Sequence, residues 1–249
     1  MDTLRETIYG RQPVLECLRA GRRRVYRLTM GRGIQPSETV SAILALAEER
    51  RIPVRRADGA PIEGIERGDN HQGMAAEVSE YPYAEIDAVL DGAGPKPLLL
   101  LLDHVQDPQN LGALLRTADA AGVQTVILPK DRAAEVTPAV VRASAGAAEH
   151  VQVCRVVNLH QAMEKLKKRE IWLAGLETVP EATLYTEADL RGALGLVVGS
   201  EGRGLSRLIR ESCDFLIRVP MLGRVGSLNA SVAGAVALYE IRRQRDAKA

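Results

Sequence analysis

The chain has 249 residues, 46% of them hydrophobic and 26% charged, which is ordinary for a soluble globular protein. No apolar run approaches the ~20 residues that a membrane-spanning helix needs, and the polar start MDTLRETIYG lacks the apolar segment of a signal peptide. The three cysteines are widely spaced without a CxxC pair, which argues against a disulfide framework and against a zinc site. We therefore expect a cytoplasmic protein with no membrane segment and no bound metal.

The formal net charge is only +1, but the charge is unevenly distributed along the chain. Residues 1–32 contain eight arginines against three acidic residues, which gives +5 for this segment. Arginine suits recognition of phosphate groups and stacking on bases, so the basic segment favours a nucleic-acid partner. A general compositional bias toward arginine remains an equally good explanation.

Residues 1–80 mix helix-like and strand-like patterns and predict a small α/β domain. A short helix is expected at residues 11–21, with Pro13 in its first turn and Gly21 as its terminator. An amphipathic helix begins after Ser37, which can cap it. Short strands are predicted at residues 25–30, 52–57 and 73–79. Residues 81–97 contain three prolines and two glycines around one short helical turn, as a linker does.

From residue 98 to residue 249, continuous apolar strands alternate with helices. This rhythm is typical of a mostly parallel sheet that helices cover on both faces. Gly122 closes the helix after the first strand, and Thr137 and Pro138 begin the next helix. In such sheets ligands bind at the carboxyl ends of the strands. Strands are predicted at residues 98–103, 123–129, 151–156, 171–177, 194–201 and 214–220, and later helices at about 158–169, 204–213 and 228–245.

Several strand ends carry residues that suit a ligand site, although each also has a purely structural explanation. The run GSEGRG that begins at Gly199 has neither the glycine spacing of a dinucleotide site nor the lysine of a phosphate-binding loop. Asn110 follows Asp107-Pro108 as a natural helix cap, and Arg116 falls within the helix that follows. Near the C-terminus, GSLN at residues 226–229 separates a strand from the final helix.

The runs NLGALLRTA, LVVGSEGRGL and VPMLGRVGSLNASVA resemble, in this order, the three sequence motifs of the SpoU family of RNA 2′-O-ribose methyltransferases. The match spans residues 97–245. It implies the deep trefoil knot of the SPOUT superfamily, with S-adenosylmethionine bound in the loops of the knot. IYGRQPVLECLRAG and HQGMAAEV resemble the family's ribosomal-protein-like RNA-binding domain at the N-terminus. This layout is most similar to members that methylate the guanosine of the peptidyl-transferase P-loop in 23S ribosomal RNA.

The resemblance also implies roles for particular residues. Arg116 is proposed in this family to act as the base after it contacts an RNA phosphate, whereas we expect it chiefly to clamp that phosphate and polarise the hydroxyl. Ser227 would cap the final helix, and Leu228 would cover the adenine. A homodimer would form through the final helix, at about residues 228–243. The implied catalytic residues are Asn110, Arg116, Glu201, Ser227 and Asn229. The implied cofactor-binding residues are Gly199, Val219, Leu228, Ala174, Gly175 and Met221. The predicted RNA-binding residues are Arg5, Arg11, Arg22, Arg23, Arg24 and Arg203.

Three other functions compete with this interpretation. The chain could be an RNA-binding or ribosome-assembly protein that has lost the activity, although the five implied catalytic residues are all present. It could methylate a guanosine of transfer RNA, but such members of the family tend to lack an N-terminal domain like residues 1–80. A nucleotide-binding α/β enzyme is disfavoured by the glycine spacing.

Overall fold

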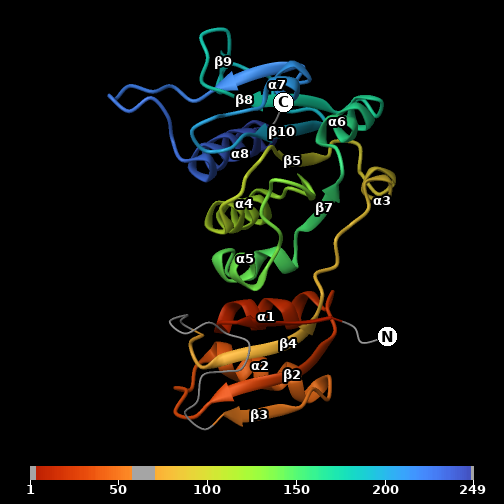
Figure 1. The fold of residues 1–249 in the computed structure, drawn as a ribbon, viewed down its shortest axis with the longest axis vertical. Coiled ribbons are helices and arrows are strands. Elements are labelled where there is room, and N and C mark those ends of the chain that lie inside the picture. Colours follow the sequence, from red (N-terminus) through yellow and green to blue (C-terminus); the bar gives the residue numbers. More distant parts are fainter. Residues whose placement is uncertain (1–3, 58–70, 248–249) are drawn as a thin grey trace. The chain divides into compact units, whose positions relative to one another are not determined.

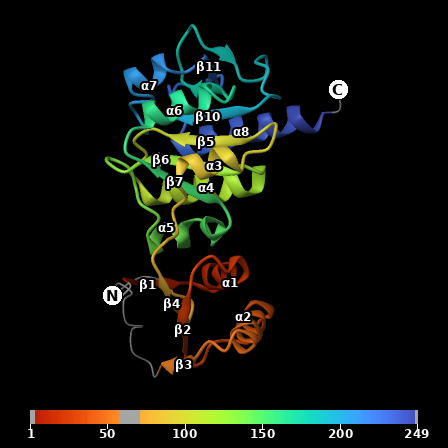
Figure 2. The same cartoon turned by 90° about the vertical axis from the view of Figure 1, so that its right-hand side faces the viewer.

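The structure is a computed structural model that describes residues 4–57 and 71–247 (Figures 1 and 2). The chain divides into two units, each with its own sheet. The first unit combines Met1–Pro82 with Val136–His150, and the second combines Tyr83–Glu135 with Val151–Ala249. The division into residues 1–80, 81–97 and 98–249 stays a prediction, because grouping by contacts does not establish which segments fold independently.

The first unit is built on a four-stranded sheet in the order β1-β4-β2-β3. Strand β4 pairs antiparallel with both β1 and β2, whereas β2 and β3 are parallel. The α/β character predicted for this part of the chain is therefore confirmed. The elements of this unit are β1 (Arg5–Tyr9), α1 (Arg11–Ala20), β2 (Val25–Gly31), α2 (Glu38–Glu49), β3 (Val54–Ala57), β4 (Met74–Ser79), α5 (Pro138–Ala143) and the 3-10 helix η1 (Ala147–Glu149).

The helix signals in the first unit behave as the sequence predicts. The hydroxyl of Ser37 accepts a hydrogen bond of 3.3 Å from the backbone N–H of Val40 and so caps α2. Gly21 ends α1 in the left-handed conformation, with φ at 62°. Strand β1 is not predicted, because its sequence RETIY lacks the regular alternation of a half-buried strand.

The segment Val136–His150 lies in the chain between two strands of the second unit but packs on α1. A Cβ atom at Gly146 would lie 2.7 Å from the Cβ of Glu16, so only glycine allows this approach. The hydroxyl of Tyr81 donates a hydrogen bond of 2.6 Å to the carbonyl of Ala148. His150 Nε2 lies 2.8 Å from a carboxylate oxygen of Glu16. These contacts fasten the segment to the first unit.

A buried ionic cluster joins this segment to the N-terminal sheet. The Arg23 side chain is fully buried; it pairs with Glu6, and its Nη1 lies 3.3 Å from Glu149. Its Nε donates a hydrogen bond of 2.8 Å to the carbonyl of Ser79. Burial raises the pKa of the Glu149 carboxyl against the opposing effect of Arg23. Burial also opposes the charge on Arg23, but Glu149 and Glu6 outweigh it and raise the pKa of Arg23. The cation therefore balances two carboxylates inside the unit.

Replacement of Arg23 tests this cluster. We expect Arg23→Ala to lower the free energy of unfolding by about 3–5 kcal/mol, because it leaves the Glu149 carboxylate buried without a cation. Denaturant unfolding of the full-length protein measures the change. The matched control is Arg24→Ala, at an exposed neighbour, for which a change of about 0.5 kcal/mol or less is expected. Equal losses for the two variants would contradict the assignment.

The second unit is built on a seven-stranded parallel sheet in the order β7-β6-β5-β10-β8-β11-β9. Its strands are β5 (Leu98–Leu102), β6 (Thr125–Pro129), β7 (Gln152–Val156), β8 (Trp172–Leu176), β9 (Thr183–Leu184), β10 (Leu194–Val198) and β11 (Phe215–Arg218). Its helices are α3 (Ile86–Asp91), α4 (Pro108–Ala121), α6 (Leu159–Lys167), α7 (Arg207–Glu211) and α8 (Ala230–Asp246). The predicted mostly parallel sheet is confirmed.

Helices on both faces explain why the central strands are apolar throughout. All five leucines of β5 are at most 2% exposed, and β10 beside it is buried along its whole length. On one face α3, α6 and α7 contribute to a shared apolar cluster with the sheet. On the other, α8 packs on α4 so closely that a Cβ at Gly234 would lie 2.7 Å from Leu114. The two-residue strand β9 is too short to leave a sequence pattern. The trefoil knot stays a prediction.

The described residues were considered for two features, a helix that could span a membrane and a cluster of side chains that could hold a metal ion. Among the helices of residues 4–57 and 71–247, none is long and apolar enough to cross a membrane. The same part of the chain contains no group of three or more His, Cys, Asp or Glu side chains placed to hold a metal ion.

Candidate active site

A closed turn of glycines, residues 199–204, follows the central strand β10; we call it the glycine turn. Ser200 and Gly204 exchange two backbone hydrogen bonds, at 3.1 and 3.0 Å. A Cβ at Gly199 would lie 2.2 Å from the carbonyl carbon of Gly204. Gly202 and Gly204 adopt φ values of 79° and 65°, which other residues rarely do. The glycines are therefore required by the shape of the turn.

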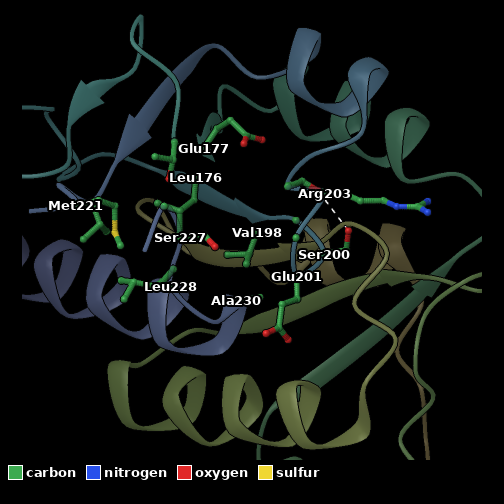
Figure 3. Close-up of a pocket in the computed structure, with 17 residues that line it drawn as sticks. Leu176, Glu177, Val198, Ser200, Glu201, Arg203, Met221, Ser227, Leu228 and Ala230 are labelled. Atoms are coloured by element: carbon green, nitrogen blue, oxygen red, sulfur yellow. Dashed lines mark hydrogen bonds between the residues drawn. The ribbon is translucent and has the colours of Figure 1, made fainter. Parts of the chain in front are cut away.

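Three of the implied catalytic side chains meet beside this turn, although they are far apart in the sequence. Asn229 Nδ2 donates a hydrogen bond of 2.8 Å to Asn110 Oδ1. Asn110 Nδ2 donates one of 3.1 Å to Glu201 Oε2, and Asn229 Nδ2 lies 3.3 Å from the same oxygen. In Figure 3 the side chain of Glu201 points toward the helix that carries Asn110. The start of α4, the glycine turn and the start of α8 thus share one polar network.

The helix caps next to this network differ from those expected. Asn110 is not the cap of α4, because Asp107 precedes Pro108 at the first helical position and accepts a hydrogen bond of 3.0 Å from Gln109 N. Asn110 instead lies in the first helical turn, where it is 6% exposed. The final helix begins at Ala230 rather than at residue 228, and Asn229 caps it in place of Ser227. Both sides of the Asn229 amide are used, one by the helix and one by the network.

The other two implied catalytic residues do not join this network. Arg116 lies exposed on α4, and within residues 4–57 and 71–247 its side chain has no hydrogen bond or ion pair. Ser227 lies exposed in the loop before α8 and lines a pocket. Arg116 is thus open to a ligand from solvent, whereas Ser227 faces the pocket described next.

The pocket lies at the carboxyl ends of β8, β10 and β11 (Figure 3) and has a volume of about 260 Å³. That is close to the lower limit of ~300 Å³ for small-molecule sites. Four of the implied cofactor-binding residues line it: Gly199, Val219, Met221 and Leu228. Its other side chains include the apolar Leu176, Val198, Ala230 and Ala233 and the acidic Glu177 and Glu201. A cavity that combines apolar side chains with backbone and polar side-chain groups suits a flat organic ligand with polar edges.

The remaining implied cofactor residues, Ala174 and Gly175, do not line this pocket. Both are buried within β8. A Cβ at Gly175 would lie 2.7 Å from Leu216 and 2.9 Å from Cys213 Sγ. The glycine therefore allows these two side chains to pack closely against β8. Cys213 is a free thiol whose pKa burial raises to about 12.

Two acidic residues near the turn were not singled out in the sequence, namely Asp103 and Glu177. They follow β5 and β8, the neighbours of β10 on either side. Asp103 Oδ2 accepts a hydrogen bond of 2.6 Å from Ser206 N, and Glu177 Oε2 accepts one of 2.8 Å from Leu205 N. A carboxylate at the carboxyl end of each flanking strand was the signal that could have identified them.

The arginines predicted to bind RNA differ in their accessibility. Arg203 is exposed and, in Figure 3, points away from the pocket. Arg5 pairs with Glu77 at 2.6 Å and remains exposed, and Arg24 lies exposed with its guanidinium over the ring of Tyr26. Arg23 is removed from the predicted set, because its side chain is buried in the ionic cluster. The partly buried members are Arg11, bonded to the carbonyl of Gln72, and Arg22, bonded to the carbonyls of Glu149 and Pro82.

A pocket and a polar network at the carboxyl edge of a parallel sheet define an α/β enzyme that binds a small molecule. The sequence profile of the SpoU rRNA methylase family matches residues 97–239. That of the RNA 2′-O ribose methyltransferase substrate-binding domain matches residues 7–84. The chain belongs to the SpoU rRNA methylase family.

Two of the similar proteins match nearly the whole chain, and a third matches about two thirds of it. The 23S rRNA (guanosine-2′-O-)-methyltransferase RlmB of Pseudomonas syringae pv. tomato is 44% identical, covering 98% of this chain and 97% of that protein. The SpoU methyltransferase AviRb of Streptomyces viridochromogenes, solved in complex with AdoMet, is 26% identical, with a TM-score of 0.81 over 98% of this chain and 92% of that chain. The A. aeolicus TrmH/SpoU tRNA modifying enzyme is 31% identical with a TM-score of 0.56, covering 65% of this chain and 81% of that chain.

The shape of the glycine turn can be tested by substitution. We expect Gly199→Ala to lower the free energy of unfolding by about 3 kcal/mol, because the new methyl group would overlap the backbone of Gly204. The control is Gly223→Ala, where a Cβ would meet nothing within 4 Å. Thermal unfolding of both variants measures the effect. A Gly199→Ala protein as stable as the control would show that the turn is not closed in solution.

Proposed function

We propose that this protein transfers a methyl group from S-adenosylmethionine to a ribose 2′-hydroxyl of RNA. The observation that carries the proposal is the network of Asn110, Glu201 and Asn229 next to the pocket, in a chain of the SpoU family. The network adjoins both the pocket and open solvent, through which an RNA can approach.

The pocket suits S-adenosylmethionine. Leu176, Val198 and Leu228 offer apolar surfaces for the adenine, and Leu228 is still 37% exposed where a ligand would cover it. The backbone of the glycine turn offers N–H and carbonyl groups for the polar edges of a nucleoside. When bound, S-adenosylmethionine supplies a methyl group already activated for displacement. The acidic Glu177 and Glu201 outnumber the basic Arg203 in the lining of the pocket, and this net negative charge favours a sulfonium.

The chain's own residues would position the ribose and handle the proton of its hydroxyl. Asn110 and Asn229 are locked in orientation, since each uses both its amide oxygen and its amide nitrogen in hydrogen bonds. Such fixed dipoles stabilise charge that develops on an oxygen without reorganising. Glu201 holds the two asparagine amides. Arg116, exposed on α4, would clamp an RNA phosphate and polarise the hydroxyl through the planar fork of its guanidinium.

For the substrate we propose the guanosine in the peptidyl-transferase P-loop of 23S ribosomal RNA. Support comes from the full-length similarity to proteins named 23S rRNA (guanosine-2′-O-)-methyltransferase. By contrast, the A. aeolicus tRNA modifying enzyme matches only 65% of the chain. The first unit, which contains all but the last two residues of the substrate-binding match at residues 7–84, supplies exposed arginines for phosphate contacts. A ribosomal substrate also accords with the cytoplasmic location expected from the sequence.

Methyl transfer from labelled S-adenosylmethionine into purified ribosomal and transfer RNA tests this function. The expected product is 2′-O-methylguanosine in the P-loop of 23S ribosomal RNA. Label in transfer RNA alone would favour the transfer-RNA alternative. Binding of S-adenosylmethionine without transfer to free RNA or to assembling ribosomal subunits would favour a silent RNA-binding protein. A chain that does not bind S-adenosylmethionine would refute the proposal.

Replacement of Arg116 separates its role in turnover from a role in RNA binding. We expect Arg116→Ala to lower kcat by about 100-fold or more, because the transition state loses a charge that orients and polarises the hydroxyl. Arg116→Lys should recover little of this loss, since an ammonium cannot reproduce the planar fork. Filter binding should show RNA affinity reduced by less than tenfold. Arg191→Ala, at an exposed arginine paired with Asp189, is the control with normal turnover. Full activity of the lysine variant would exclude the fork geometry.

We also propose that the protein is a homodimer formed through α8. Val232 and Tyr239 on this helix are 48% and 55% exposed, and Leu222 in the preceding loop is 97% exposed. A second copy would cover these apolar side chains. Sedimentation of the wild-type protein at micromolar concentration should give twice the chain mass, and Tyr239→Glu should give the monomer. A wild-type monomer under these conditions would contradict the proposal.

A further inference from the structure

We infer that Asp103 and Glu177 are positioning residues that hold the exit of the glycine turn from both sides. This inference rests on the proposed function, because the turn forms a wall of the pocket and carries Glu201. Neither carboxylate belongs to the catalytic set implied by the family motifs. Each would act through the backbone of the turn rather than by touching the ribose.

The carboxylate of Asp103 fixes one side. Asp103 directly follows β5, and its backbone N–H donates a hydrogen bond of 2.8 Å to the carbonyl of Val198, the last residue of β10. Its side chain is 2% exposed, and Oδ2 accepts the 2.6 Å hydrogen bond from Ser206 N. The other oxygen, Oδ1, lies 2.5 Å from His104 Nδ1. Both oxygens are therefore occupied, and the carboxylate cannot turn away from the chain that it holds.

The carboxylate of Glu177 fixes the opposite side. Glu177 follows β8, and its backbone N–H donates a hydrogen bond of 3.0 Å to the carbonyl of Ile217 on β11. Its Oε2 accepts the 2.8 Å hydrogen bond from Leu205 N. A Cβ at Gly204 would lie 2.5 Å from Glu177 Oε1, so the last glycine of the turn makes room for this carboxylate.

The two held groups are consecutive backbone N–H groups at the point where the chain leaves the turn. They belong to Leu205 and to Ser206, the N-cap of α7, and lie before the first residue of the helix, so they have no acceptor within the helix. Within the turn, the backbones of Ser200 and Gly204 bond to each other, and the Glu201 side chain bonds to Asn110. Hydrogen bonds to carboxylates are about twice as strong as those between neutral groups, so they suit the task of fixing the backbone at the exit of the turn. The exit of the turn is thus tied to the strands on both sides of β10.

This arrangement has a consequence for the site. If either carboxylate is removed, the turn can shift against its neighbours, and Glu201 moves relative to Asn110 and Asn229. The wall of the pocket moves with it. A carboxylate that merely stabilised the start of α7 would affect unfolding but leave the pocket intact. Cofactor affinity, measured without RNA, separates these two roles.

The experiment measures S-adenosylmethionine binding by calorimetry for the full-length protein and the variants Asp103→Ala, Glu177→Ala, Glu177→Asp and Glu177→Gln. We expect the dissociation constant to rise at least tenfold for both alanine variants. Glu177→Asp keeps the charge, but its side chain is too short to reach Leu205 N. Its dissociation constant should therefore rise as much as that of Glu177→Ala. Glu177→Gln keeps an acceptor oxygen at the right distance and loses only the charge, so its dissociation constant should rise less than that of Glu177→Asp. Affinity of each variant for 23S ribosomal RNA should stay within threefold.

The control is Asp189→Ala, which removes an exposed carboxylate that also accepts a backbone N–H bond, from Arg191, but does not line the pocket. It should bind S-adenosylmethionine as the wild type does. Wild-type affinity in Glu177→Asp, or in alanine variants that merely unfold at lower temperature, would overturn the inference. If the wild-type protein itself failed to bind S-adenosylmethionine, the proposed function would fall instead. Unfolded alanine variants would leave Glu177→Asp and Glu177→Gln to decide.

Discussion

The hydrogen bond between Asn110 and Asn229 is the contact on which the site depends, because it joins the start of α4 to the start of α8. The same Asn229 amide caps α8, so the position of a whole helix and the orientation of one side chain are set together. Glu201 completes the link to the central strand through the glycine turn. The close packing of α8 on α4 at Gly234 keeps the two helix ends in register. The packing of α8 on α4 therefore determines the geometry of the site.

The two units differ in the partners of their charged side chains. In the first, the buried Arg23 is committed to Glu6 and Glu149, while Arg5 and Arg24 stay at the surface. The basic residues of this unit thus divide between Arg23, which holds the unit together, and arginines that are exposed at the surface. In the second, carboxylates near the pocket are bonded mainly to neutral N–H groups of the backbone and of asparagine side chains. Among the residues that line the pocket, two carboxylates, Glu177 and Glu201, outnumber one guanidinium, that of Arg203, and the net negative charge suits a positively charged cofactor.

Much of the sheet of the second unit could be predicted from the sequence, because buried parallel strands such as β5 are continuous apolar runs. Strands β1 and β9 could not be predicted. The sequence of β1 lacks a regular alternation of apolar and polar residues, and β9 has only two residues. The meeting of Asn110, Glu201 and Asn229 followed from motif resemblance alone, since no local pattern links residues so far apart. The helix caps were misassigned because several adjacent polar residues could serve equally well. The burial of Arg23 depends on Glu149, more than a hundred residues away, and so leaves no local signal.

The first unit is discontinuous in the sequence, because it includes the segment Val136–His150. The chain passes between the two units three times, after Pro82, after Glu135 and after His150. The substrate-binding unit is therefore not one continuous stretch of gene, and a cut after residue 82 would separate Arg23 from Glu149 and Glu16 from His150. Exchange of this unit among relatives, by recombination or in the laboratory, must carry two stretches of sequence at once.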